Sequence, residues 1–227
     1  MTLAMQRSRS KAVMIKQWLT GVAAALGLAV AAQALAAPSA PDETLKAAVA
    51  EIQDLLAKNH AKYKADKPGY FKMVDEKIVP HFDVPYIARS VLARNWKTAT
   101  PEQQARFQDA FKNMLIRSYA DAMIENYDSV KVEWKPVRMA EGATDATVNT
   151  NLLRNGKPPV GIGFSMRLVG ADWKITDITI ENLSLVQNFR GQFASELKKS
   201  DLNSLITRME GGQFTTDTPK SGGSAPQ

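Results

Sequence analysis

The chain has 227 residues, 29 of them Lys or Arg and 23 of them Asp or Glu, so its formal net charge is +6. This length predicts one folded domain, and a basic chain raises the question of a nucleic-acid partner. The chain contains no cysteine. That absence excludes disulfides, a thiolate metal site, a cysteine nucleophile and a lipid anchor on a processed N-terminal cysteine.

The first 36 residues have the three parts of a secretory signal peptide. Four basic residues and no acidic residue come before Leu19, an uncharged apolar run covers 18–32, and Ala34-Leu35-Ala36 follows the small-x-small cleavage pattern. The run is shorter than the roughly 20 residues of a spanning helix, which disfavours the alternative of an uncleaved anchor. We therefore expect Sec export to the periplasm, with cleavage near Ala36 or Ala37.

Most of the positive charge belongs to this leader. Without residues 1–36 the chain keeps 25 basic and 23 acidic residues, a net charge of +2, so we expect no nucleic-acid partner. The predicted folded domain covers 37–210. Residues 211–227 are rich in Gly, Ser, Thr and Pro and are predicted to be disordered.

Apolar residues at helical spacing dominate the first half of the domain. They predict a helix over 42–65 with Asp42 at its N-cap, a break at Pro68-Gly69, and further helices over 70–82 and 84–92.

The strongest helix start lies at Thr100-Pro101-Glu102-Gln103, which combines a capping box with proline at the first helical position. It predicts a long helix to about Tyr127. The apolar face of this helix comprises Phe107, Phe111, Met114, Leu115, Tyr119, Met123 and Tyr127.

After Tyr127 the apolar period changes to two, which is typical of antiparallel strands. The predicted strands cover 130–135, 146–152, 160–168 and 173–180. Asn155-Gly156 predicts a hairpin turn, and a change of phase predicts a bulge near Thr176-Asp177. Ser184 and Asp201 are predicted to cap two final helices. The fold class is therefore α+β, with an antiparallel four- to five-stranded sheet packed against helices.

Residues able to support catalysis are scarce. His60 and His81 have no partner at metal-ligand spacing, and surface or capping roles suit them better. The sequence has no phosphate-binding loop, nucleophile elbow or zinc spacing. Asp177 is the one carboxylate inside an apolar strand run, so it is either a general base, as in cone-shaped α+β isomerases, or an acceptor for backbone donors at its own bulge. We favour the second, because no companion acid or base is visible. We expect no catalytic residue, metal site or cofactor.

The third predicted strand has one bulky and one small face. Ile162, Phe164 and Met166 alternate with Gly161, Gly163 and Ser165. Such small residues leave room for a helix or a ligand to approach closely. A Met- and aromatic-rich stripe is more often core than pocket, so this pattern alone indicates only an exported α+β domain.

Several segments share their order and spacing with one known family. They are Phe82-Asp83, Ile87–Leu92 with Trp96, Thr100–Tyr119, Trp173–Ile178 and Ser184–Phe193. In this respect the chain resembles the MlaC family, also called toluene-tolerance auxiliary proteins, over about 44–209. One departure is Ala93, where relatives usually have Gly.

The resemblance implies a non-enzymatic carrier that shuttles phospholipid across the periplasm and maintains outer-membrane lipid asymmetry. Acyl chains would lie in an apolar cleft between sheet and helices, as cargo and not as a cofactor. The partners implied are an outer-membrane lipoprotein–porin complex and an inner-membrane ABC transporter complex with its substrate-binding ring. Two alternatives remain: an enzyme acting on a small substrate through Asp177, and a non-lipid periplasmic adaptor with a solid core.

For the carrier, two groups of site residues are expected. The lipid-binding residues are Phe107, Phe111, Leu115, Tyr119, Ile162, Phe164, Met166, Ile178 and Phe189. The candidates for contact with the head group or a partner are Arg190, Arg106, Arg138 and Arg167, each with simple solvation as its alternative. A bulky residue on the third strand, Gly163→Trp, is expected to block lipid.

Overall fold

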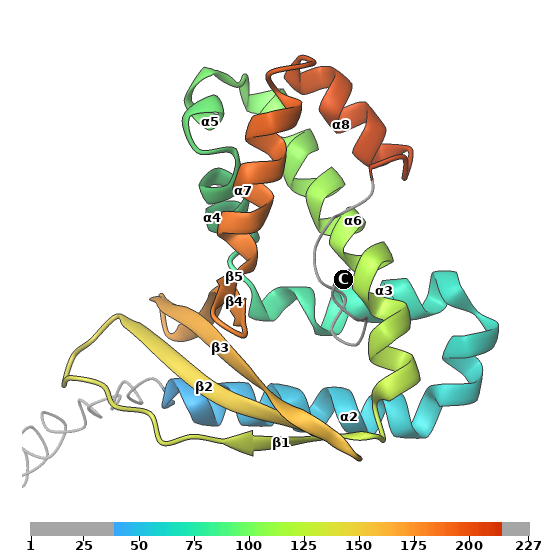
Figure 1. Cartoon of the computed structure of the whole chain (residues 1–227), viewed down its shortest axis with the longest axis vertical. Helices are drawn as coiled ribbons and strands as arrows, with labels where there is room; N and C mark the ends of the chain where they lie inside the picture. Colours follow the sequence, from blue (N-terminus) through green and yellow to red (C-terminus); the bar gives the residue numbers. More distant parts are fainter. Residues whose placement is uncertain (1–38, 215–227) are drawn as a thin grey trace, which may run out of the picture. The chain divides into compact units, whose positions relative to one another are not determined.

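The computed structural model describes residues 39–214 (Figure 1). The helices before the sheet are α2 (Pro41–Ala65), α3 (Lys67–Lys77), the 3-10 helix η1 (Val79–His81), α4 (Val84–Leu92), α5 (Arg94–Thr98) and α6 (Pro101–Asn126). The strands are β1 (Val130–Trp134), β2 (Asp145–Arg154), β3 (Lys157–Val169), β4 (Asp172–Ile180) and β5 (Leu183–Ser184). Helices α7 (Leu185–Glu196) and α8 (Leu202–Glu210) follow.

The strands form one antiparallel sheet in the order β1-β2-β3-β4-β5. This confirms the predicted α+β fold with a sheet of four to five strands. The predicted signal peptide lies outside the described residues, as does the predicted tail beyond residue 214. Within that tail, Phe214 is described, and its ring packs 5.2 Å from the ring of Phe193.

Helix starts are set by short polar side chains, as the sequence indicated in three of four places. Thr100 forms the full capping box with Gln103, and Ser184 and Asp201 each accept a backbone N–H of their own helix. The prediction for Asp42 was wrong. Helix α2 begins at Pro41 without a side-chain cap, and Asp42 instead pairs with Lys46 one turn later.

The predicted break and the second helix need correction. Pro68 and Gly69 lie in the first turn of α3, where Asp66 caps the helix by accepting the Gly69 N–H. Proline fits there because the first turn has no use for its missing N–H. Ala93, between α4 and α5, has φ +50°. This backbone conformation favours glycine, the residue that the resemblance led us to expect at this position.

The sheet presents two chemically different faces because neighbouring residues of a strand point to opposite sides. On one face Phe164 lies between Val148 and Ile178. On the other, Gly163 lies between Asn149 and Thr179. The predicted bulge is confirmed. Ser165 pairs with Asp177 and Met166 with Ile175, so that Thr176 is the extra residue.

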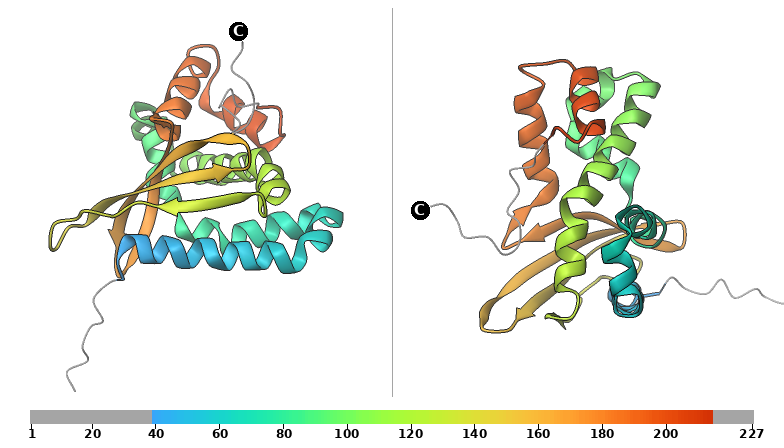
Figure 2. Two further views of the ribbon diagram at one scale, coloured as in Figure 1. Left: turned by 60° about the horizontal axis from the view of Figure 1, so that its bottom comes forward. Right: turned by 90° about the vertical axis from the view of Figure 1, so that its right-hand side faces the viewer.

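Three groups of buried residues hold the domain together. The first joins α4, α6, α7 and α8 around four phenylalanines, the second joins α2, α3 and α6, and the third joins the apolar sheet face to Leu45 of α2. Helix α6 extends from the neighbourhood of the sheet to that of α8 (Figure 2), so its two ends belong to different groups.

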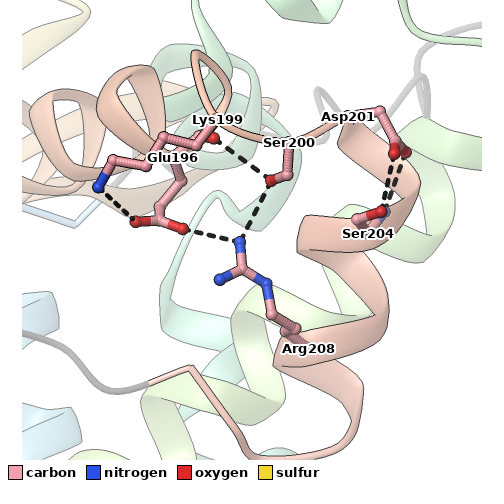
Figure 3. Close-up of polar contacts among 6 residues, drawn as sticks. All are labelled: Glu196, Lys199, Ser200, Asp201, Ser204 and Arg208. Carbon is pink, nitrogen blue, oxygen red and sulfur yellow. Dashed lines mark hydrogen bonds and ion pairs between the residues drawn. The ribbon is translucent and has the colours of Figure 1, made fainter.

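Ion pairs fix α8 to its neighbours. Arg208 donates to Glu196 of α7 at 2.7 Å and to Ser200 at 3.3 Å, while Asp201 caps α8 through Ser204 (Figure 3). The hydrogen bond from the Arg208 guanidinium holds the pKa of Glu196 below its usual value of 4.5. Arg106, on α6, lowers the pKa of Glu210 in the same way.

This arrangement predicts acid-sensitive docking of α8. A carboxylate whose folded-state pKa is lowered stabilises the fold above its unfolded-state pKa, and that contribution is lost as the pH falls through the folded-state pKa. We therefore expect denaturant midpoints to be flat near neutrality and to fall below about pH 4.5. Urea titrations near neutrality and below about pH 4.5 measure this fall. The denaturant midpoint of the double variant Glu196→Gln/Glu210→Gln should fall less between the two conditions. An equal fall of the midpoint in the variant would show that Glu196 and Glu210 do not cause the acid sensitivity.

Candidate functional site

An apolar cavity of about 380 Å³ lies between the sheet and helices α3, α4, α6 and α7. Its walls are almost entirely hydrocarbon. The side chains come from every element around it, so no single segment of sequence defines the site. A concave apolar cavity of this size is typical of sites that enclose a small or chain-like apolar ligand.

Most of the predicted lipid-binding residues come together in this cavity. Seven of the nine line it, namely Phe111, Leu115, Tyr119, Ile162, Phe164, Ile178 and Phe189. Phe107 and Met166 do not. Phe107 lies one turn before Phe111, level with α7 and α8, and is fully buried among phenylalanines. Met166 lies on the other side of the bulge and packs with Trp173 in the buried group that includes Leu45 of α2.

A second wall of the cavity was not predicted from the sequence. It is formed by α3, η1 and the start of α4, and its residues are Val74, Ile78, Val79, Phe82, Val84 and Ile87. These elements are short, so their periodicity is too weak to indicate which side faces inward. The sequence did show the apolar residues themselves, but only tertiary packing places them opposite α6.

The small face of β3 points away from the cavity, which corrects the expectation for Gly163→Trp. Ile162 and Phe164 line the cavity, so the residue between them faces the other side of the sheet. A Cβ on Gly163 would lie 3.1 Å from the Asn149 side chain and not in the cavity. A bulky residue at this position should therefore leave the cavity open.

None of the four predicted arginines lines the cavity. Arg106 pairs with Glu210, Arg190 donates to the Ser90 carbonyl, and Arg138 is exposed in the loop between β1 and β2. Arg167 pairs with Asp83 at 3.2 Å and lies over the Tyr86 ring. The cation that does line the cavity is Lys112 of α6, which is not among the predicted site residues.

Asp177 lies at the cavity wall but is engaged by the start of α7. Its Oδ2 accepts the Ser184 hydroxyl at 2.5 Å, and its Oδ1 accepts the Val186 N–H at 3.1 Å. The donors belong to the helix and not, as the sequence suggested, to the bulge itself. Asp177 therefore anchors the helix that supplies Val186 and Phe189 to the cavity wall.

The anchoring role gives a testable contrast between two substitutions. Asp177→Ala removes the acceptor of two partly buried donors and should lower the free energy of unfolding by about 0.5–2 kcal/mol. Asp177→Asn keeps an amide oxygen for the Val186 N–H and should cost less than half as much. Chemical denaturation measures both. If Asp177 were instead a general base, Asp177→Asn would abolish cellular function while leaving stability almost unchanged.

The two histidines lie away from the cavity lining. The His60 ring contacts Tyr127, with the ring centroids 4.9 Å apart. Burial and the nearby Lys174 lower the pKa of His81, which keeps it uncharged near neutrality. Within residues 39–214, no three His, Asp or Glu side chains gather in a way that could hold a metal ion.

Fold and cavity together define an α+β protein with an apolar chamber between an antiparallel meander and its helices. No helix between residues 39 and 214 combines the length and hydropathy needed to cross a membrane. The sequence profile of the MlaC protein family matches residues 46–211. The chain belongs to the MlaC family.

Individual relatives agree with this assignment. The toluene tolerance protein ttg2D of Pseudomonas putida is 25% identical over 173 residues, which are 75% of this chain and 80% of that protein. The intermembrane phospholipid transport system binding protein MlaC of Haemophilus influenzae is 22% identical over 202 residues, 87% of this chain and 94% of that one. A phospholipid-binding protein from Ralstonia solanacearum, solved in complex with a phospholipid, is 32% identical with a TM-score of 0.68, covering 75% of this chain and 94% of that chain.

Proposed function

We propose that this protein is a periplasmic carrier that binds phospholipid by its acyl chains in the cavity between sheet and helices. The observation that carries the proposal is the cavity of about 380 Å³, whose lining is apolar apart from very few side chains. Membership of the MlaC family and the phospholipid complex of the Ralstonia relative support it.

The physical requirement is a dry place for hydrocarbon. Each methylene moved out of water contributes about 0.8 kcal/mol, so an acyl chain of ordinary length left in water would cost more than about 10 kcal/mol. Ile162 and Ile178 of the sheet and Leu115 of α6 provide hydrocarbon to the cavity lining. A carrier needs such a chamber, and an adaptor with a solid core would not retain one.

Exchange of lipid with membranes depends on the same free energy of burying hydrocarbon. A chain that leaves a bilayer for this cavity exchanges one apolar environment for another, so transfer is close to thermoneutral and its direction must come from partners. The partners proposed are an outer-membrane lipoprotein–porin complex and an inner-membrane ABC transporter complex with its substrate-binding ring. In this role the protein carries out no chemical step, and Asp177 serves the fold.

Native mass spectrometry tests the proposal directly. Protein expressed from the full chain and purified without detergent or added lipid should carry a mass increment that fragments to phospholipid. Lipid-depleted protein should regain that increment from vesicles. A protein that stays empty in both experiments is not a phospholipid carrier.

A further inference from the structure

One lysine interrupts the apolar wall of the cavity. Lys112 lies at helical spacing from Leu115 and Tyr119 on the face of α6 that lines the cavity. Its side chain is 21% exposed, and its Nζ lies 2.9 Å from Oδ1 of Asp75 on α3, which is 44% exposed. The aliphatic stem thus belongs to the cavity wall while the ammonium reaches the surface. Lys112 marks a place where the hydrocarbon chamber meets water.

The charges around Lys112 are mixed in sign. Asp75 is its close partner, and Asp109 of α6 lies at 4.0 Å. The other charged residue of the lining, Asp177, is engaged by the start of α7. An ammonium has three donors, and only one short contact to a carboxylate is present here, so Lys112 can also donate to a phosphate oxygen.

A purely anionic head group would meet one positive and two negative side chains at this position. A zwitterionic head group matches the pattern better, because its phosphate can pair with Lys112 while its own ammonium pairs with Asp75 or Asp109. A primary ammonium can donate hydrogen bonds to those carboxylates, whereas a glycerol head group offers no positive charge.

We propose that Lys112 and Asp75 form a head-group site at the edge of the cavity, which favours phospholipids with a phosphate and a primary ammonium over anionic ones. This inference rests on the proposed function and adds the residues that discriminate among its cargo. The pair also ties α3 to α6, so a test must separate recognition of lipid from support of the fold.

The chain offers a matched control for that separation. Lys67 of α3 and Asp121 of α6 form a second ion pair between the same two helices, at 2.8 Å. Neither residue lines the cavity. Neutralising this pair should disturb the docking of α3 on α6 as much as neutralising the first, without touching the head-group site.

The experiment is competitive loading. Lipid-depleted protein from the full chain is equilibrated with vesicles of equal phosphatidylethanolamine and phosphatidylglycerol content, and the bound lipids are quantified by mass spectrometry. Asp75→Asn should lower the bound ethanolamine-to-glycerol ratio about threefold, since it removes the partner of the ammonium. Lys112→Met should raise the ratio about threefold, since the remaining carboxylates repel the anionic lipid. Lys67→Met and Asp121→Asn should leave it unchanged.

The outcomes are distinct. Opposite shifts in Asp75→Asn and Lys112→Met, with total lipid per protein maintained, support the site. Unchanged ratios in both variants with normal loading overturn the head-group site and leave the proposed function standing. Equal shifts in the Lys67 and Asp121 controls also overturn it, because helix docking would then explain the effect. Absence of lipid from the unaltered protein overturns the proposed function itself.

Discussion

Ile162→Trp is expected to weaken phospholipid binding by this protein while leaving it folded. Ile162 of β3 lines the cavity, as does Leu115 of α6. The larger indole occupies space that an acyl chain needs, and overpacking of about 1–3 kcal/mol corresponds to a loss of about 5- to 150-fold in lipid affinity. The indole should bury in an apolar site, so the denaturant midpoint of the lipid-depleted protein should not fall.

Two neighbouring positions serve as controls for this variant. Gly161→Trp and Gly163→Trp place the same side chain on the opposite face of β3, where a Cβ on Gly161 meets no atom within 4 Å. Both should load lipid normally when loading is measured by native mass spectrometry. Normal loading of Ile162→Trp, or loss of loading in both glycine variants, would mean that the ligand occupies the other face of the sheet.

Phe107→Ala should have the largest effect on stability and little effect on lipid binding. The Phe107 ring is fully buried and contacts Phe111 and Phe193, with ring centroids 5.8 and 5.5 Å away. Removing it leaves a void in a packed core, which costs about 3–5 kcal/mol of the free energy of unfolding. Under conditions where the variant remains folded, lipid stoichiometry should match that of the unaltered protein.

Phe164→Ala is the natural comparison, since Phe164 lines the cavity and is only partly buried. It should lose less stability than Phe107→Ala and release lipid faster, because contacts with the acyl chain are lost. Stability from urea titration and lipid release to acceptor vesicles measure the two effects. The reverse ranking, with Phe107→Ala releasing lipid faster, would place Phe107 at the ligand and contradict the packing described above.

The sequence by itself determined those features that depend on local chemistry. The capping box at Thr100 and Gln103 fixes the start of α6, and the change of period after Tyr127 fixes the strands. The phase change near Asp177 gave the bulge. Each signal lies within a few residues, because capping and strand alternation depend on neighbours along the chain. The resemblance to the MlaC family led us to expect nine contact residues, and seven of them line one cavity.

Tertiary structure decided what depends on neighbours distant in sequence. Phe107 and Phe111 are identical residues one helical turn apart, yet one meets α7 and α8 in a closed core while the other reaches the cavity. The depth of a side chain along α6 depends on which elements pack beside each turn, and no local pattern records that. For the same reason, none of the four predicted arginines lines the cavity, whereas Lys112 does. Asp75, its partner, lies on α3, and only the packing of α3 against α6 brings the two together at the edge of an apolar chamber.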